Sequence, residues 1–198
     1  MFKSDGSLIF ASSFADYTMK SIPRDIILTT ERLRLRAADL SDVDLVWDVS
    51  RFDGFNDGMT WEPPNSKEEI VAITERNMAD WQSGVDYIFT IEIKDDGASI
   101  GRVGLLKKKA PGIWSIGFWI HPKYWNRGFA TEAARAILDF GFQRIEAVKI
   151  TTDHAAWNQQ SEMVIRKLGF KYVGENPRGF IKNGQPVLVL EYDFSKQV

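Results

Sequence analysis

The residues best suited to bind an anion lie between Ile116 and Phe142. An apolar segment runs to Ile120, Pro122 ends it, and a short polar loop leads into a helix that begins near Gly128. The loop amides and the first helical N–H groups lack intrahelical partners, and the helix macrodipole adds about half a positive charge at that end. Because Gly128 carries no side chain, a ligand could approach the backbone closely. The pattern is compatible with an anion site, although many helices that begin in this way bind nothing.

Polar residues also follow the next predicted strand, 148–153, at its carboxyl end. Asp153 and His154 are titratable and could act as an acid or a base at that edge, or could form no more than an exposed turn pair. Asn158 then begins a helix that stops at Gly169. From spacing alone, Asn158 is a helix N-cap and Gly169 a helix C-cap.

The composition excludes several other kinds of site. There is no cysteine, which rules out a disulfide framework, a thiolate zinc site and a cysteine nucleophile, and two histidines are too few for a metal cage. The net charge is −2, from 25 basic and 27 acidic residues, so the chain lacks the excess of basic residues that binding to nucleic acid or an anionic membrane favours. No P-loop motif is present, and Gly101 to Gly104 is too short for a dinucleotide-binding motif. Small ligands or peptides are therefore the expected partners.

The chain length and hydrophobic content predict one domain, at residues 26–198. A chain of 198 residues with 44% hydrophobic residues can bury a full core. Residues 1–25 have only scattered apolar residues broken by Ser, Asp and Gly, so they form neither a signal-peptide core nor a membrane span. We expect them to be a flexible arm, with an edge strand at 8–10 as the alternative, and we expect a cytoplasmic protein.

Hydrophobic periodicity predicts an α/β fold with about seven strands and about four helices. The strand at 148–153 should run parallel to the one that ends at Ile120, because the helix between them makes a right-handed crossover. The stretch 51–64 is rich in Gly, Asn, Asp and Pro but also carries aromatic residues, which favours a long structured loop that could cover a site. The expected strands are 30–36, 87–93, 99–106, 114–120, 148–153, 171–173 and 186–194. The expected helices are 39–50, 66–83, one from about 128 and one at 158–168.

The segment Tyr124-Trp-Asn-Arg-Gly-Phe-Ala-Thr-Glu-Ala133 resembles the acetyl-CoA loop of the GNAT superfamily of N-acetyltransferases, usually written Gln/Arg-x-x-Gly-x-Gly/Ala. Trp125 departs from Gln/Arg, and this departure is typical of the RimJ/RimL-like branch of ribosomal-protein N-terminal acetyltransferases. A second signature, Asn-x-x-Ser followed by Leu-Gly-Phe, matches residues 158–161 and 168–170. The resemblance covers about residues 28–194.

This resemblance implies a mixed, mostly antiparallel sheet with a splayed parallel pair, and a strand that bulges at Gly117 where pantetheine binds. It also implies acetyl-CoA as the cosubstrate, with no metal. In relatives the signature Asn bonds pantetheine and the Ser hydroxyl approaches the CoA sulfur. The cofactor-binding residues that it implies are Trp119, Ile120, Trp125, Asn126, Arg127, Gly128, Phe129, Ala130, Thr131, Asn158 and Ser161.

The implied chemistry is acyl transfer from a thioester to an amine. A neutral amine attacks the carbonyl carbon, a hydrogen-bond donor stabilises the carbonyl oxygen, and a proton donor helps the thiolate to leave. Without cysteine, direct attack is the economical mechanism. The backbone near Trp119 and Ile120 would supply the donor N–H, and Ser161 would protonate the thiolate.

Three departures remove the bases that relatives use. Ser115 replaces a Glu on the strand before the loop, Ile165 replaces a Tyr seven residues after the signature Asn, and Phe180 replaces a Glu near the last turn. Asp153 and His154 are the local candidates for the general base, acting directly or through water. The expected catalytic residues are therefore Ser161, Asp153 and His154.

The sequence thus predicts an acetyl-CoA-dependent N-acetyltransferase that acts on a primary amine, first of all the N-terminal α-amine of a protein or peptide. One alternative acceptor is a small amine such as an antibiotic or a polyamine. Another alternative is a domain that binds CoA without catalysis. We expect a monomer or homodimer that binds neither nucleic acid nor membrane.

Overall fold

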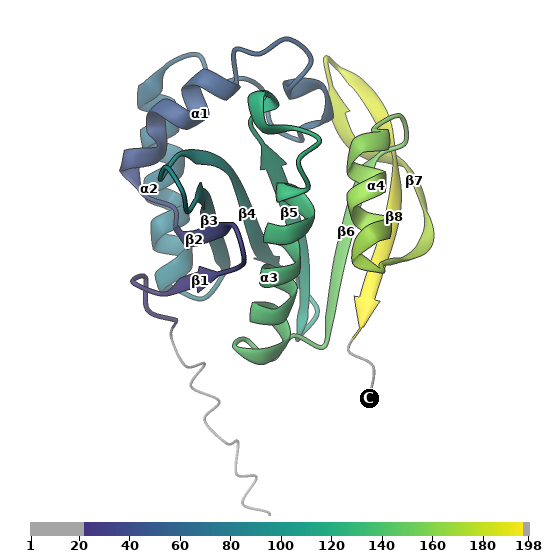
Figure 1. Cartoon of the computed structure of the whole chain (residues 1–198). Helices are drawn as coiled ribbons and strands as arrows, with labels where there is room; N and C mark the ends of the chain where they lie inside the picture. Colours follow the sequence, from purple (N-terminus) through teal and green to yellow (C-terminus); the bar gives the residue numbers. More distant parts are fainter. Residues whose placement is uncertain (1–21, 196–198) are drawn as a thin grey trace, which may run out of the picture.

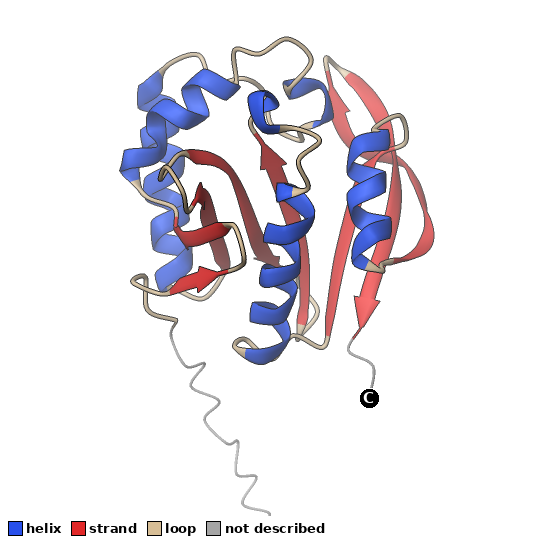
Figure 2. Ribbon diagram, viewed as in Figure 1, coloured by secondary structure: helices blue, strands red, loops and turns tan. Residues whose placement is uncertain are grey.

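Helices cover both faces of one eight-stranded sheet (Figures 1 and 2). The structure is a computed structural model, and it describes residues 22–195. The strand order along the sheet is β1-β2-β3-β4-β5-β6-β8-β7. The strands are β1 Ile27–Thr29, β2 Leu33–Ala37, β3 Asp86–Ile93, β4 Ser99–Lys107, β5 Ile113–Ile120, β6 Lys149–Ala155, β7 Lys171–Lys182 and β8 Gln185–Ser195. The helices are α1 Val43–Val49, α2 Lys67–Gln82, α3 Phe129–Gln143 and α4 Gln159–Leu168, with short 3-10 helices η1 Leu40–Asp42, η2 Asn56–Gly58 and η3 Pro122–Tyr124.

The expected mixed sheet with one parallel pair is confirmed. Every neighbouring pair of strands is antiparallel except β5 and β6. Their parallel pairing joins only Ile113–Ser115 to Lys149–Thr151. Beyond that point β5 stays paired with β4 as far as Ile120, and β6 stays paired with β8 as far as Ala155. The two strands therefore part in the middle of the sheet, as the family resemblance implied.

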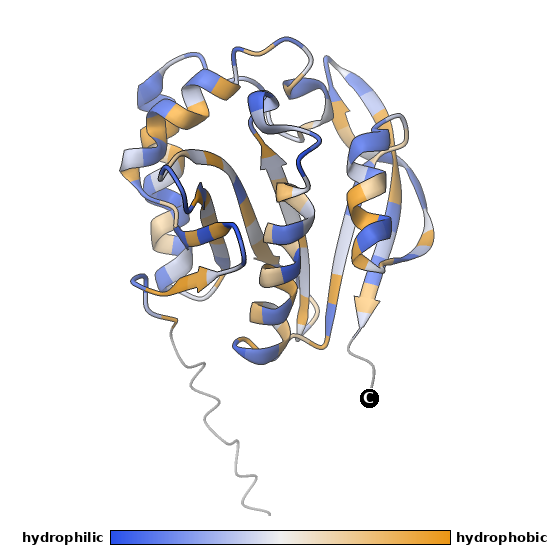
Figure 3. Ribbon diagram, viewed as in Figure 1, coloured by the Kyte–Doolittle hydropathy of each residue, from blue (hydrophilic) through white to orange (hydrophobic). Residues whose placement is uncertain are grey.

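The core fills the space between the sheet and helix α3. Ala133, Ala134 and Ile137 of α3 are fully buried. Gly141 allows the helix to come close to the sheet, because a Cβ there would lie 2.7 Å from Cδ1 of Ile150. The helices carry both hydrophilic and hydrophobic residues along their length, as amphipathic helices do (Figure 3). Side chains alternate along β4, so Leu105 packs towards α3 while its neighbours face α1 and α2.

Several predicted boundaries changed. The strand expected at 30–36 begins only at Leu33 and follows a further strand, β1, because Thr30 closes a turn in which its hydroxyl accepts a hydrogen bond from Leu33 N–H at 3.0 Å. The helix expected at 39–50 begins as the 3-10 helix η1, in which Leu40 is exposed. The last two strands are longer than the predicted 171–173 and 186–194.

Two local predictions were wrong in detail. The spacing of Ser66 and Glu69 predicts a capping box, but it is only half formed, because the Glu69 carboxylate accepts from the N–H of Asn65 at 2.8 Å rather than from Ser66. The bulge expected at Gly117 is absent, since the pairing of β4 with β5 runs without a shift and places Gly117 opposite Gly104. The strand departs from regular sheet by leaving β6, not by slipping against β4.

The expected arm at 1–25 lies mostly outside the described residues, as does the alternative strand at 8–10. Its last residues contact the domain. The Ile22 carbonyl accepts a hydrogen bond from Nε1 of Trp81 at 2.8 Å, and Nη2 of Arg24 donates to the Ala38 carbonyl at 2.6 Å. Residues 22–25 are therefore part of the packed structure.

Threonine hydroxyls support the backbone where β5 and β6 part. The hydroxyl of Thr152 donates to the carbonyl of Ile116 at 3.1 Å, one residue beyond the last parallel pair. Thr152 is buried, so this carbonyl has little access to water. We expect Thr152→Val, which keeps the shape, to lower the free energy of unfolding by about 1–3 kcal/mol, because a buried acceptor loses its donor. Urea denaturation would measure the change.

The control is Thr151→Val. The hydroxyl of Thr151 makes a similar bond, to the carbonyl of Trp114 at 3.2 Å, but Thr151 is only half-buried and lies within the paired region. We expect a smaller loss there, because water can replace the hydroxyl. An equal loss for both variants would contradict a special role for Thr152 at the parting point.

Candidate active site

The loop between β5 and α3 turns its backbone amides towards one side. Asn126 and Gly128 both have positive φ values, 60° and 79°, on either side of Arg127. Such alternation of backbone conformation makes a concave nest of N–H groups that suits an anion. Gly128 is the N-cap of α3 and makes no side-chain cap, so no N-cap side chain competes for the N–H groups of the first turn.

A tryptophan holds the start of this loop. Nε1 of Trp125 donates to the carbonyl of Ile120 at 2.6 Å, which ties the loop back to the end of β5. The residue that departs from the usual Gln/Arg pattern therefore has a structural contact that its sequence position did not predict.

The turn between β1 and β2 also holds this loop, through contacts of Thr30 and Arg32 that are here called the brace. The Glu132 carboxylate accepts hydrogen bonds from the Thr30 hydroxyl at 2.6 Å, from the Arg32 N–H at 2.9 Å and from Arg32 Nε at 2.7 Å. Nη1 of Arg32 also donates to the carbonyl of Arg127 at 3.0 Å, and its guanidinium lies 4.6 Å from the centre of the Phe129 ring. No sequence signal identified this brace, because about 100 residues separate its two halves.

A pocket of about 660 Å³, here called the loop pocket, opens beside this loop. The structure brings together at its wall all eleven residues that were predicted to bind the cofactor. They are Trp119, Ile120, Trp125, Asn126, Arg127, Gly128, Phe129, Ala130, Thr131, Asn158 and Ser161.

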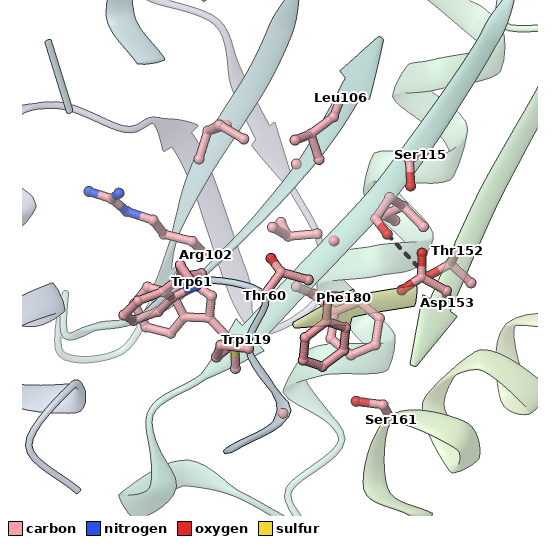
Figure 4. Close-up of a pocket in the computed structure, with 18 of the residues that line it drawn as sticks. Thr60, Trp61, Arg102, Leu106, Ser115, Trp119, Thr152, Asp153, Ser161 and Phe180 are labelled. Carbon is pink, nitrogen blue, oxygen red and sulfur yellow. Dashed lines mark hydrogen bonds between the residues drawn. The ribbon is translucent and has the colours of Figure 1, made fainter. Parts of the chain in front are cut away.

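A second pocket of about 560 Å³, here called the sheet pocket, lies against β4 and β5 on the side of α1 and α2 (Figure 4). Its wall includes residues from β4, β5 and β6, from the long loop 51–64 and from β7. Those labelled in Figure 4 are Thr60, Trp61, Arg102, Leu106, Ser115, Trp119, Thr152, Asp153, Ser161 and Phe180. The expectation that the aromatic loop covers a site agrees with this placement.

The two pockets meet where β5 and β6 have parted. Six residues line both, namely Gly58, Met59, Phe118, Trp119, Asn158 and Ser161. The loop 51–64 comes very close to the start of α4 here, since a Cβ on Gly58 would lie only 2.7 Å from Nδ2 of Asn158. Phe55 is buried edge-on against Trp119, with ring centres 5.7 Å apart, and fixes the loop.

The helix-cap interpretations of α4 are both observed. Oδ1 of Asn158 accepts from the N–H of Ser161 at 3.1 Å, and Gly169 ends the helix with a φ of 88°. The cap leaves Asn158 at the wall of both pockets, so this residue can hold α4 and still face a ligand.

Asp153 and His154 lie on opposite faces of β6, as neighbours on a strand must. His154 is buried and stacks on Tyr192, with Nδ1 2.8 Å from the carbonyl of Ala155 and Nε2 3.3 Å from the Tyr192 hydroxyl. Both ring nitrogens thus have partners inside the protein. Both residues line the sheet pocket, but only Asp153 is exposed there, and with the His154 ring nitrogens engaged this geometry favours Asp153 as a base.

The surroundings of Asp153 raise the pKa of its carboxyl above the ordinary value. The main cause is desolvation by the pocket walls, and the carboxylate of Glu191 on the paired strand β8 adds to it. The positive charge of Lys108 opposes the shift. A raised pKa makes this carboxylate a better acceptor for a proton near neutral pH.

The three positions that depart from the family pattern have different surroundings. Ser115 and Phe180 line the sheet pocket, where they replace two carboxylates. Ile165 is buried in the core, with 1% of its surface exposed. The sequence did not single out Ile73, Arg102 or Leu106, which also line the sheet pocket.

In the part of the chain that the structure describes, no three His, Cys, Asp or Glu side chains gather closely enough to hold a metal ion. None of the described helices is long and apolar enough to cross a membrane.

Comparisons with known proteins point to one family. Residues 32–171 match the family described as "Acetyltransferase (GNAT) domain". The uncharacterized N-acetyltransferase YnaD of Bacillus subtilis is 27% identical over 149 residues, which is 74% of this chain and 84% of YnaD. Spermidine N(1)-acetyltransferase of Escherichia coli is 36% identical over 66 residues, 33% of this chain and 36% of that enzyme. Among solved structures, RimL, a ribosomal L7/L12 alpha-N-protein acetyltransferase in complex with coenzyme A, superposes with a TM-score of 0.79 at 20% identity, covering 86% of this chain and 98% of RimL.

The brace on the loop predicts a pH-dependent contribution to stability. Burial raises the pKa of Glu132, but its hydrogen bonds with Thr30 and Arg32 outweigh burial and leave the pKa below the ordinary value. A depressed pKa stabilises the fold above the unfolded pKa of about 4.3, and the contribution is lost as the pH falls through the folded pKa. We expect Glu132→Gln to cost about 1 kcal/mol at pH 7, discounted because Arg32 is largely exposed.

Urea denaturation at pH 7 and in acid would test this, with Glu162→Gln as the control. Glu162 pairs with Arg166 on the exposed face of α4, away from the loop, so its loss should be smaller. The wild type and Glu132→Gln should converge in acid. A difference that is the same at both pH values would show that the charge of Glu132 does not stabilise the loop.

Proposed function

The chain belongs to the GNAT family of acetyltransferases, and we propose that it transfers an acetyl group from acetyl-CoA directly to the N-terminal α-amine of a protein or peptide. The observation that carries this proposal is the meeting of the loop pocket and the sheet pocket at Trp119, Asn158 and Ser161. One pocket would hold the cofactor and the other the acceptor. The acetyl group would then lie between them.

The loop pocket has the features that acetyl-CoA needs. The nest of amides from Asn126 to Ala130 would hold the pyrophosphate, and the side of β5 that faces the parted strand would accept the pantetheine. Because β5 has no β6 partner beyond Ser115, backbone groups there could bond the cofactor, apart from the Ile116 and Ile120 carbonyls, which accept from Thr152 and Trp125. A donor N–H near Trp119 and Ile120 would stabilise the negative charge on the thioester oxygen during attack.

The leaving thiolate would take its proton from Ser161, which lines both pockets at the first turn of α4. The amine must reach the carbonyl as the neutral form, and Asp153 would accept its proton directly or through water. His154 has its ring nitrogens engaged and would position β6 and β8 rather than act on the substrate.

The absence of a strong inherited base favours an α-amine over a lysine. An α-amine has a pKa near 8, so about a tenth is neutral at pH 7, whereas a lysine with a pKa of about 10.4 is neutral in about one part in 2,500. An enzyme with only a weak base can serve the first kind of acceptor far more readily.

A small amine is the second candidate acceptor. It is supported by the 66-residue match to a spermidine acetyltransferase. A polyamine carries several positive charges, however, and the sheet pocket presents the cations Arg102 and Lys108 as well as acidic groups. We therefore place it second, and a domain that binds CoA without turnover third.

The cofactor site can be tested at Gly128. A Cβ at this residue would lie 3.5 Å from Nη2 of Arg32 and would carry the strain of a positive φ. Gly128→Ala controls for that strain, about 1–2 kcal/mol. We expect Gly128→Glu to weaken acetyl-CoA binding by about 100-fold or more beyond Gly128→Ala, because a like charge beside the pyrophosphate costs several kcal/mol. Calorimetry on the folded variants would measure it, and equal affinities would remove the loop from the site.

The acceptor can be tested with paired peptides. We expect peptides with a free α-amine to be acetylated faster at pH 7 than the same peptides blocked at the N-terminus and bearing a lysine, with a rate that rises up to about pH 8 as the α-amine deprotonates. A thiol dye would follow the release of CoA. Faster reaction of the lysine peptides or of a polyamine would shift the assignment to the second candidate. Binding of acetyl-CoA without turnover on any amine would indicate a binding domain.

A further inference from the structure

Arg102 is a buried cation whose guanidinium lacks hydrogen-bond partners. It lies on β4 opposite Trp119 of β5, and only 7% of its surface is exposed. Its Nε and Nη2 atoms are shielded from solvent and have no hydrogen-bond partner. An arginine remains charged at any ordinary pH, and a buried charged donor without an acceptor is costly. This guanidinium is therefore short of an acceptor that the described residues do not supply.

Among the described residues, the one carboxylate within 4 Å of Arg102 cannot fill that need. Asp42 approaches Nη2 of Arg102 only to 3.9 Å. Its two oxygens already accept from two nitrogens of Arg36 at 2.6 and 3.2 Å, from the Thr90 hydroxyl at 2.6 Å and from the Asp39 N–H at 3.0 Å. Three of these four bonds go to Oδ2, the oxygen that lies 3.9 Å from Arg102, so that atom has no lone pair left for Nη2. The negative charge of Asp42 lowers the free-energy cost of burying the Arg102 charge. It does not supply a hydrogen-bond acceptor to Nε or Nη2.

Arg102 forms part of the wall of the sheet pocket, and its guanidinium would have to turn towards the pocket for the shielded Nε and Nη2 atoms to meet a ligand there. In Figure 4 its guanidinium lies across the pocket from Asp153 and Ser161, beyond Trp61 and Trp119. Because β5 lies between β4 and β6, the backbones of Arg102 and Asp153 are at least two strand spacings apart, about 10 Å. A group bound by Arg102 would thus be far from an amine held near Asp153.

We propose that Arg102 is a specificity-determining residue that binds a carboxylate of the acceptor, and that the preferred acceptor is a peptide with an acidic side chain within its first few residues. This inference rests on the proposed function. The amine and carboxylate of a single α-amino acid lie within about one residue length, 3.8 Å, and could not reach both ends of the pocket. An extended peptide advances about 3.3–3.6 Å per residue, so an acidic side chain two or three residues from the N-terminus could.

The test uses peptides that differ only in Glu or Gln at positions two to four, with wild-type enzyme and Arg102→Met. We expect the wild type to prefer the best-placed Glu peptide by about 10- to 100-fold in kcat/KM, mostly through KM, because a bond between two charged groups discriminates that strongly. In Arg102→Met the preference should fall to about twofold or less, while the dissociation constant of acetyl-CoA stays unchanged. Arg102→Lys keeps the positive charge but lacks the paired N–H donors of a guanidinium, so it should retain part of the preference.

Arg34→Met is the matched control. Arg34 lies on β2, pairs with Glu92 and is outside both pockets, so its removal changes the net charge equally and should leave the Glu preference intact. The melting temperature separates a ligand role from a structural one. Removal of an unpaired buried charge should leave the Tm of Arg102→Met equal or higher, whereas a clear fall or a failure to fold would show that Arg102 is satisfied within the protein and would overturn the proposal.

The remaining outcomes separate this proposal from the proposed function. If peptides are acetylated but Glu and Gln versions react equally in the wild type, the N-terminal acceptor stands and the role of Arg102 is wrong. If no peptide reacts, but a small amine bearing a carboxylate does and loses its advantage in Arg102→Met, then Arg102 binds a carboxylate and the peptide assignment is wrong. If neither reacts, or if the preference survives in Arg102→Met, the inference fails.

Discussion

The parting of β5 and β6 is the constraint on which the rest of the structure depends. Three residue pairs hold these strands together, from Ile113–Lys149 to Ser115–Thr151, and beyond them each strand keeps only its outer neighbour. A backbone that leaves its partner inside a sheet exposes N–H and C=O groups that must be satisfied. The hydroxyl of Thr152 meets one of these needs, at Ile116, and the remaining edge of β5 borders the two pockets.

Segments that are far apart in the chain enclose the opening from both sides. The loop 51–64 is fixed by Phe55 against Trp119 and comes close to α4 at Gly58. Lys182 at the end of β7 ties the same loop to the last hairpin, through the carbonyl of Trp61 at 2.9 Å and the carboxylate of Glu62 at 3.1 Å. In the proposed function, the two pockets that meet between these segments would place a thioester between two ligands, which is the arrangement that direct acyl transfer needs.

The two pockets are polar in different ways. The loop pocket offers backbone N–H groups and the positive end of α3, which suit an anion that every member of a CoA-dependent family would share. The sheet pocket offers side chains, and there the usual carboxylates are replaced by Ser115 and Phe180 while an unpaired arginine remains. In the proposed function, backbone chemistry would therefore serve the common cosubstrate, and side-chain chemistry would choose the acceptor.

The sequence by itself determined the family, the order of the elements and the loop that begins α3. These features are local, since they follow from periodicity, from Gly128 and from the spacing of Asn158 and Ser161 within single segments. Sequence also placed eleven residues that the fold gathers at one pocket.

Only the tertiary structure decided which side chains face that opening and which serve the core. It buried His154 against Tyr192 and left Asp153 exposed at the pocket, although both residues line it. It also buried Ile165 away from the site and joined Arg32 to Glu132 across 100 residues. It also left Arg102 beside Asp42, whose nearer carboxylate oxygen already accepts from three donors. Such outcomes depend on which strands become neighbours and on how far they stay paired. No single segment of sequence carries that information, because the side chains and strands that meet come from distant parts of the chain.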